Sequence, residues 1–397
     1  MIEEEPGQPI PFIRRIIVVN YRSIAQCSVA LGPLTVLLGF NASGKSNFLD
    51  VLRFVSEALE TSPVQAATRR GGLDSLLHRG LRGAARRFSI DLELSIRLPG
   101  DSAIYPAAYG FTIGPDRENE NALVVLAERG EIGAVQLSLE QSGHSSRLRL
   151  PATAIDENAP QSVLERALRS MRFYDFDTAV LSELDESSPQ RPYLGSSGEH
   201  LGRVLGELAN DQTGKDRLDA YVSALVPGAL SVDERREGRY STVQARFQAG
   251  AGEEVFQRES LSEGTLRAAG VLAALFQSPV FAGRVPLVGI EEPETALHPA
   301  GVAALYEALL DASERTQVIV TSQSSDLLDN EYAGLAHLRA ASSVDGATEI
   351  GEVDAAGRAI VEKGLSSISE LHRSGQMQPE RHHFTPRAII TRTRPAT

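Results

Sequence analysis

One eight-residue stretch constrains the fold of this chain more than any other. Residues 39–46 read Gly-Phe-Asn-Ala-Ser-Gly-Lys-Ser, between an apolar run at residues 34–38 and an amphipathic segment at residues 45–59. A strand, a glycine-rich turn and a helix in this order are the setting that a phosphate-binding P-loop requires. A glycine-rich turn that carries Lys-Ser by chance would need neither flank. We therefore predict a nucleotide-binding loop at this point.

The residue types of the loop fit the chemistry of phosphate binding. Gly39 and Gly44 allow the backbone to curl, so that successive N–H groups and the helix N-terminus face an anion. Lys45 is placed to contact the β- and γ-phosphates of ATP, and the Ser46 hydroxyl is placed to bind Mg²⁺. The predicted nucleotide contacts in the loop are Gly39, Phe40, Asn41, Ala42, Ser43, Gly44, Lys45 and Ser46.

Length and composition set limits on the rest of the chain. With 397 residues, of which 42% are hydrophobic, it can form two ordinary domains or one large α/β domain with insertions. No apolar run approaches the roughly 20 residues of a membrane span, and residues 1–11 are acidic rather than a basic leader. Cys27 is the only cysteine, which fits a reducing compartment. We expect a cytoplasmic protein without a membrane partner.

The net charge argues against a protein that coats nucleic acid uniformly. The formal charge is −13, whereas non-specific DNA affinity comes largely from cations that displace phosphate counterions. One local exception exists, and it reads equally well as a solvated face or as a DNA-contacting patch. Its arginines are Arg69, Arg70, Arg79, Arg82, Arg86 and Arg87.

Periodicity predicts three parts within residues 12–375. The P-loop part, residues 12–60, begins with two short strands around a turn at residues 20–23. Residues 61–260 alternate in a way that predicts an antiparallel sheet followed by a helical insertion. The expected strands are 88–96, 105–113, 122–126, 135–139, 147–150, one near Ser231 and 240–247; the expected helices are 161–170 and 200–224, with a loop at 186–198 between them.

The third part, residues 261–375, alternates between helices and strands. We expect helices at residues 262–276 and 300–310, and strands at 285–290 and 316–321. Such alternation calls for a parallel sheet. Residues 376–397 contain three prolines and several arginines, which predicts a weakly ordered tail. The sequence thus predicts an α/β P-loop NTPase with a mixed or parallel core sheet, an antiparallel β subdomain and a helical insertion.

Two adjacent carboxylates follow the strand expected at residues 285–290. Paired acids after a strand are often a solvated turn, but in a chain with a P-loop this is where the metal partner and the hydrolytic base belong. Glu291 would hold Mg²⁺, and Glu292 would orient and deprotonate the attacking water. Adjacent residues on a strand point in opposite directions, which allows the two different roles.

The order of several motifs is more specific than any one of them. Leu261-Ser262-Glu263-Gly264 alone is a capped helix start. After the P-loop and before a strand with Glu-Glu-Pro, Thr295-Ala296-Leu297-His298 and a strand ending in Thr-Ser-Gln-Ser, it resembles the ABC-type ATPase heads. The details resemble the RecF, structural-maintenance-of-chromosomes (SMC) and OLD-like group, namely the entry motif at residues 20–23, Asn47 after the P-loop, and Glu-Glu-Pro-Glu followed by Leu-His-Pro. The resemblance is greatest to stand-alone bacterial ATPases without a Toprim domain.

The resemblance implies a site built from two copies of the chain. ATP would lie between one P-loop and the Ser262 and Gly264 signature of a second copy, so that ATP joins a head-to-tail homodimer. Arg22 and Asn47 would join the nucleotide contacts. Gln323 stands where the family has a switch histidine; because Gln cannot become cationic, we expect slow turnover. The metal-binding acid is Glu291 where many relatives have Asp, and Gln136 and Gln141 both remain candidates for the Q-loop glutamine.

Two classes of function are compatible with such an ATPase. The first is a DNA-associated switch in genome maintenance or antiphage defence, which the family context favours. The second is an ATP-dependent regulator or scaffold of a partner protein without nucleic-acid contact, which the acidic charge favours. A transporter subunit is disfavoured by the Glu-Glu-Pro-Glu segment. The stretch after Ser324 is too short for a Toprim nuclease, so DNA cleavage would require a separate nuclease or effector protein.

Overall fold

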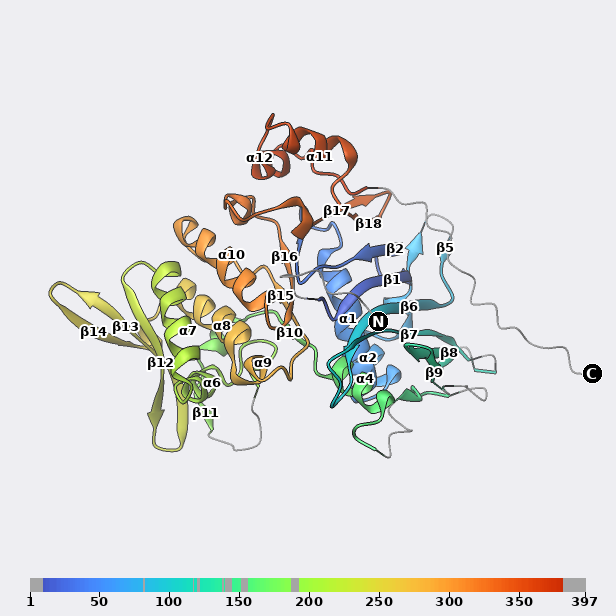
Figure 1. Ribbon diagram of the computed structural model, residues 1–397, viewed down its shortest axis with the longest axis horizontal. Helices are drawn as coiled ribbons and strands as arrows, with labels where there is room; N and C mark the ends of the chain where they lie inside the picture. Colours follow the sequence, from blue (N-terminus) through green and yellow to red (C-terminus); the bar gives the residue numbers. More distant parts are fainter. Residues whose placement is uncertain are drawn as a thin grey trace, which may run out of the picture.

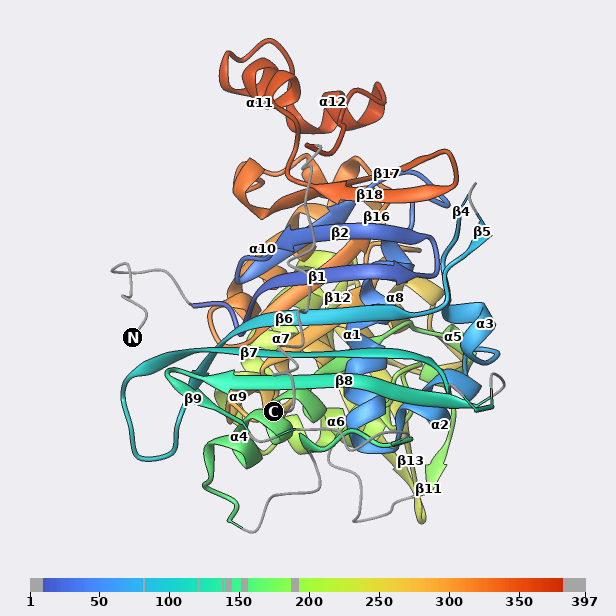
Figure 2. The same ribbon diagram turned by 90° about the vertical axis from the view of Figure 1, so that its right-hand side faces the viewer.

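The chain is arranged around two large β-sheets with one long helix between them. The computed structural model describes residues 10–80, 83–116, 118–119, 122–137, 139, 145–150, 156–186 and 193–380. Figure 1 shows the antiparallel sheet on one side of the molecule and a helical layer with a small sheet on the other. Figure 2 shows the antiparallel sheet face-on.

The core sheet carries the predicted parallel strands. Its six strands are, in order, β10 (Arg172–Tyr174), β15 (Leu287–Glu291), β16 (Gln317–Ser322), β3 (Leu34–Leu38), β17 (Leu338–Val344) and β18 (Ala347–Gly351). The first five strands pair in parallel, and β18 is an antiparallel edge. The strand before the P-loop is thus the fourth of six and is paired on both sides.

The second sheet is antiparallel and begins with the predicted pair of strands. Its order is β2 (Ile24–Ala30), β1 (Ile13–Tyr21), β6 (Phe88–Arg97), β7 (Ile104–Pro115), β8 (Leu123–Ile132) and β9 (Val135–Gln136). In the turn between β1 and β2, Asn20 and Arg22 have φ angles of 60° and 48°. The prediction of a strand at residues 147–150 is wrong. Only Ser145 bridges to Val125 there, while Leu148 and Leu150 fill the core as part of a loop.

A helical layer and a small sheet cover the other face of the core sheet. The helix expected at residues 200–224 is interrupted at 209–211, where Asp211 begins a new helix as its N-cap residue. The elements are α6 (Leu201–Leu208), α7 (Gln212–Leu225), α8 (Glu263–Phe276), α9 (Ser278–Phe281) and α10 (Pro299–Ser313), with strands β11 (Asp185–Glu186), β12 (Ala229–Glu237), β13 (Tyr240–Ala249) and β14 (Gly252–Gln257).

Shorter elements complete the described chain. They are α2 (Pro63–Thr68), α3 (Leu73–Leu76), β4 (Arg79–Gly80), β5 (Gly83–Ala84), α4 (Pro160–Arg169), α5 (Thr178–Leu181), α11 (Ala355–Glu362) and α12 (Ile368–Arg373), with 3-10 turns η2 (Arg258–Ser260), η3 (Asp326–Leu328) and η4 (Leu335–His337). None of the helices in the described part of the chain is long and apolar enough to span a bilayer.

The beginning of the predicted tail is ordered against the body. Pro379 bridges to Val353, and the Asp354 amide donates to the Gln378 carbonyl at 2.9 Å. Met377 is 8% exposed and belongs to the hydrophobic core that lies beneath the helical layer. Residues 376–380 therefore depart from the weakly ordered tail that was predicted for residues 376–397. Residues 381–397 lie outside the described residues.

Two hydrophobic cores meet at β3. Successive side chains of a strand point to opposite faces, and Val36 and Leu38 belong to the core beneath the helical layer, whereas Leu37 belongs to the core around α1 (Lys45–Glu60). That helix is buried along most of its length, with Phe48 and Phe54 fully enclosed. The P-loop therefore connects a strand and a helix that are both fixed by burial.

The close approach of α7 and α10 generates a test of this packing. A Cβ atom at Gly301 would lie 2.4 Å from the Leu225 carbonyl oxygen, which is backbone and cannot move aside. We expect Gly301→Ala to lower the free energy of unfolding by about 1–3 kcal/mol in chemical denaturation.

Gly206→Ala is the matched control on α6. Its nearest obstacle is the flexible end of the Glu234 side chain. Alanine favours helix, so this variant should match the unsubstituted protein to within about 1 kcal/mol or exceed it in stability. Equal losses in both variants would contradict the packing described here.

Candidate nucleotide-binding site

The start of the P-loop is anchored to β16, the strand beside β3 in the core sheet. The Gly39 amide donates to the Ser322 carbonyl at 3.3 Å, which ties the start of the loop to the end of β16. The loop then turns back on itself through a Ser43 to Phe40 hydrogen bond of 3.2 Å. Ala42 and Gly44 have positive φ angles of 63° and 95°. The backbone thus takes the curled form that the glycines predicted.

Strands β17 and β18 explain why two loop positions carry glycine. A Cβ atom at Gly39 would lie 2.3 Å from the Ala341 carbonyl oxygen, and one at Gly44 would lie 1.9 Å from the Thr348 hydroxyl. Thr348 is also within 2.7 Å of the Ser23 hydroxyl, which accepts a hydrogen bond from Asn47 at 2.6 Å. The loop therefore rests directly on the last strands of the core sheet.

Lys45 lies inside the loop rather than in solvent. It is 5% exposed, and its Nζ donates to the carbonyls of Gly39 and Phe40 at 2.7 and 3.1 Å. Burial lowers the pKa of the Lys45 ammonium, while the three carboxylates of residues 291–294 act in the opposite direction. The positive charge is thus held at the mouth of the loop and faces an acidic segment.

Ser46 and Glu291 are adjacent, as a shared metal would require. Glu291 ends β15, its carboxylate pairs with Arg53 at 3.4 Å, and the Ser46 side chain lies close enough to act on the pKa of that carboxyl. Burial raises the pKa of the Glu291 carboxyl. A hydroxyl and a carboxylate are the oxygen donors that Mg²⁺ takes alongside water and phosphate oxygens. The donor set therefore fits the predicted ion.

Glu292 is turned away from Glu291 and toward Gln323. It has a φ of 43°, and its amide donates to the Thr321 carbonyl at 3.0 Å. Its carboxylate accepts a hydrogen bond of 2.9 Å from the Gln323 side chain. The two residues assigned to catalysis from the sequence are therefore in direct contact, at the ends of neighbouring strands.

Glu294 is a buried acid next to this site whose burial the sequence alone did not predict. It is 8% exposed; one carboxylate oxygen accepts a hydrogen bond from Ser322, and the other has no partner among the described residues. Burial raises the pKa of the Glu294 carboxyl, because the ionised form loses its hydration. No local pattern marks this burial, because the donor Ser322 is 28 positions away in the sequence.

The Ser262 and Gly264 signature lies at the start of α8. The Ser262 hydroxyl caps the helix by accepting from the Thr265 amide at 3.1 Å. A Cβ atom at Gly264 would lie 2.5 Å from the Ala296 carbonyl oxygen. Within the described ranges, no hydrogen bond or ion pair joins either residue to the P-loop of the same chain.

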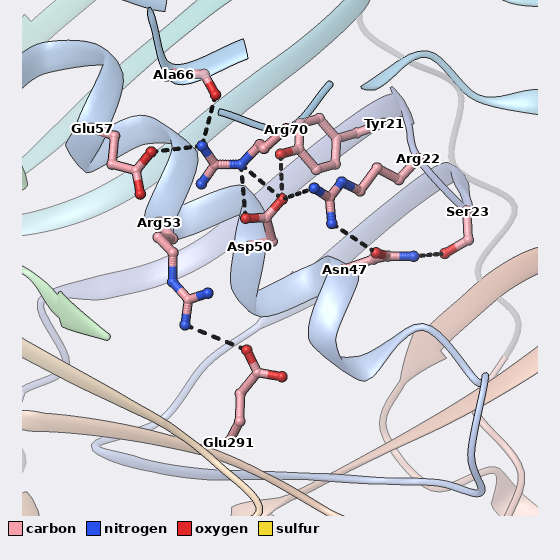
Figure 3. A network of polar contacts seen from close by, with 10 residues as sticks. All are labelled: Tyr21, Arg22, Ser23, Asn47, Asp50, Arg53, Glu57, Ala66, Arg70 and Glu291. Carbon is pink, nitrogen blue, oxygen red and sulfur yellow. Dashed lines mark hydrogen bonds and ion pairs between the residues drawn. The ribbon is translucent and has the colours of Figure 1, made fainter. Parts of the chain in front are cut away.

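Arg22 belongs to a network centred on Asp50 of α1 (Figure 3). The Asp50 carboxylate pairs with Arg22 at 3.3 Å and with Arg70 at 2.8 Å, and it accepts a hydrogen bond from Tyr21 at 2.7 Å. Arg22 also donates to the Asn47 side chain at 3.4 Å. The guanidinium predicted to contact nucleotide is therefore held beside the loop by α1.

The arginine patch is only partly available to DNA. Arg70 does not belong to the exposed patch, because its side chain is 6% exposed and pairs with Asp50 and Glu57. Arg69, Arg79, Arg86 and Arg87 are exposed, and Arg82 lies outside the described residues. The spacing of charges along the sequence could not reveal a partner on α1. Of the two Q-loop candidates, Gln136 is exposed on β9 and Gln141 is not described.

Fold and site together define a class of protein. A P-loop after a central parallel strand, two adjacent acids at the end of β15, a glutamine after β16 and a capped signature helix make up an ABC-type ATPase head of the RecF and SMC group. Residues 34–329 match the family described as "AAA domain, putative AbiEii toxin, Type IV TA system". The chain belongs to this ATPase family, which confirms the assignment made from the motifs.

Proteins of similar sequence support the same assignment over part of the chain. Proteins named DNA replication and repair protein RecF, from Brucella suis and Brucella abortus, are each 30% identical over 117 residues. The match spans 29% of this chain and 28% of each relative, so the chain matches little more than a quarter of their length.

Solved structures of SMC heads share the fold. An SMC head bound to the C-winged helix domain of ScpA has a TM-score of 0.55 and 14% identity, with 88% of this chain and 100% of that chain covered. A head with an extended coiled coil, bound to the C-terminal domain of ScpA derived from Pyrococcus furiosus, has a TM-score of 0.54 and 12% identity, with 90% and 100% covered.

Glu294 provides a test of the buried electrostatics. A carboxyl whose pKa is raised in the folded protein binds its proton more tightly when folded, so stability falls as pH rises from the unfolded pKa through the folded one. Glu294→Gln keeps an acceptor for Ser322 and removes the charge. We expect its melting temperature to exceed that of the unsubstituted protein near about pH 8, with the difference shrinking toward about pH 4.

Glu292→Gln serves as the matched control, since it makes the same change two residues away on a half-buried side chain. Thermal unfolding without nucleotide across this pH range is the measurement. A Glu294→Gln difference that stays constant with pH would show that burial does not perturb this carboxyl.

Proposed function

We propose that this protein binds ATP and slowly hydrolyses it, and that ATP drives head-to-tail dimerisation. One observation carries the proposal: Lys45, the Ser46 and Glu291 pair, and the Glu292 and Gln323 pair meet at one edge of the core sheet, while the Ser262 hydroxyl of the signature bonds to its own helix and not to the P-loop. In this proposal, a P-loop that does not meet the Ser262 and Gly264 signature of its own chain forms only half of an ATP site. A second copy, related by two-fold symmetry, would supply the other half in each of two sites.

The residues take distinct roles in this scheme. Lys45 and the loop amides would hold the phosphates, and Ser46 and Glu291 would hold Mg²⁺, which when bound neutralises developing charge on the transferred phosphoryl group. Glu292 would orient the attacking water and take its proton, with its carboxylate held by Gln323. Because Gln323 contributes no positive charge near the γ-phosphate, the turnover should be slow.

ATP-driven dimerisation is tested by separating binding from hydrolysis. Glu292→Gln keeps the Gln323 contact but removes the proposed base. Size measurements of both proteins with and without ATP should show monomers without nucleotide, a dimer with ATP, and a longer-lived dimer for the variant. Lys45→Ala is the control that should not dimerise. Monomers under all conditions would contradict the sandwich.

For the wider role, we propose a DNA-associated switch in genome maintenance or antiphage defence. The sequence match to RecF proteins supports a role near DNA. The structure offers a route for coupling: the Arg22 amide donates to Leu76 at 2.7 Å, His78 contacts the Arg22 carbonyl at 2.8 Å, and the Asn20 side chain donates to the Arg87 carbonyl at 3.3 Å. The arginine-rich segment thus packs on the turn that carries Arg22.

DNA association should depend on the exposed arginines and on salt. Replacing Arg86 and Arg87 by Ala should weaken binding of duplex DNA and flatten its salt dependence, by roughly one unit of slope per lost phosphate contact. Arg235 and Arg236 on β12, also adjacent, are the matched control pair. Salt-insensitive or absent binding, with and without ATP, would favour the second class instead: an ATP-dependent regulator or scaffold of a partner protein.

A further inference from the structure

A short C-terminal helix connects two segments that border the nucleotide site. The His372 ring, on α12, stacks on the Phe40 ring of the P-loop, with centroids 5.6 Å apart and planes 21° from parallel. The next residue, Arg373, donates to the Ser325 hydroxyl at 3.3 Å and pairs with Asp329 at 3.4 Å. Figures 1 and 2 both show α11 and α12 as a unit beyond β17 and β18. Consecutive residues of α12 thus contact the P-loop and the segment after Gln323.

His372 is an unusual residue for a packing role. It is 4% exposed, and its Nε2 has no hydrogen-bond partner among the described residues, although an unpaired buried ring nitrogen costs free energy. Burial, then the charges of Lys45 and Arg373, lowers the pKa of the imidazole, which keeps the ring neutral near neutral pH. Phe40, by contrast, is 59% exposed. Hydrophobic burial alone explains neither side chain.

Both contacts of α12 adjoin the expected position of the terminal phosphate. Lys45, whose role in a P-loop is to contact the β- and γ-phosphates, donates to the Phe40 carbonyl at 3.1 Å. Gln323, on the other side, donates to the proposed base Glu292. Ser325 follows Gln323 by two residues. The helix therefore bridges the two parts of the chain between which a γ-phosphate would lie.

We propose that α12 is a positioning element that makes the site distinguish ATP from ADP. Through His372 and Arg373 it fixes the first turn of the P-loop relative to the segment after Gln323. Only a nucleotide with a γ-phosphate contacts both segments, so only ATP gains from having them ordered in advance. ADP depends on the Gly44 to Ser46 end of the loop. The inference deepens the proposed ATP site and rests on it.

Nucleotide affinities of three variants test this role. His372→Ala removes the stack, and Arg373→Ala removes the other contact without disturbing the fold, since its side chain is 56% exposed. Leu365→Ala is the matched control in the same helical unit, where Leu365 is 74% exposed. Titration calorimetry with ATP or ADP and Mg²⁺, all in the Glu292→Gln background, prevents hydrolysis. Thermal unfolding checks that each variant is folded.

We expect His372→Ala and Arg373→Ala to bind ATP roughly tenfold more weakly and ADP within about twofold of the parent protein. Leu365→Ala should leave both affinities unchanged. An unaltered preference for ATP in both variants, or equal weakening of both nucleotides, would overturn the positioning role alone. Failure of the parent protein to bind either nucleotide would overturn the proposed function as well.

Discussion

The parallel pairing of β3 with β16 and β17 is the constraint on which the rest of this molecule depends. Parallel strands end at the same edge of a sheet, and ligands of open α/β sheets bind outside that edge. Because β3, β16 and β15 run in the same direction, the P-loop, Gln323 and the two acids emerge side by side, although 284 positions separate Gly39 from Gln323 in the sequence. The glycines then follow from the same pairing, since β17 and β18 leave no room for a side chain at Gly39 or Gly44.

Helix α1 transmits this geometry to the antiparallel sheet. It begins at Lys45, lies between the two sheets, and carries Asp50, whose carboxylate holds Arg22 on one side and Arg70 on the other. Two positive charges share one buried acid, so a nucleotide that drew Arg22 toward a phosphate would leave Asp50 to Arg70 and Tyr21. The contacts of Asp50 with Arg22 and Arg70 thus connect the nucleotide site directly to the segment that carries the arginine patch.

The elements that could be predicted from the sequence are those whose local patterns agree with the global fold. The P-loop with its flanking strand and helix, the first two strands, and the parallel alternation after residue 261 are all encoded by nearby residues, and the structure confirms them. Burial, and hydrogen-bond partners that are distant in the sequence, could not be predicted from local patterns. Arg70 looked like its exposed neighbours because its partner Asp50 is 20 positions away, and no local pattern marks Glu294 as buried because its donor Ser322 is 28 positions away. The Phe40 and His372 stack joins residues more than 300 positions apart, so no pattern could show it.

The central claim is that each ATP site takes its P-loop from one copy of the chain and its signature from another, and mixing two inactive variants tests it most directly. Lys45→Ala removes one half of the site and Ser262→Arg the other, so neither protein alone should hydrolyse ATP. In an equimolar mixture, a mixed dimer has one intact site, formed by the P-loop of the Ser262→Arg copy and the signature of the Lys45→Ala copy, so part of the ATPase rate of the unsubstituted protein should return on mixing. No recovery on mixing, or full activity of either variant alone, would contradict a site shared between two copies.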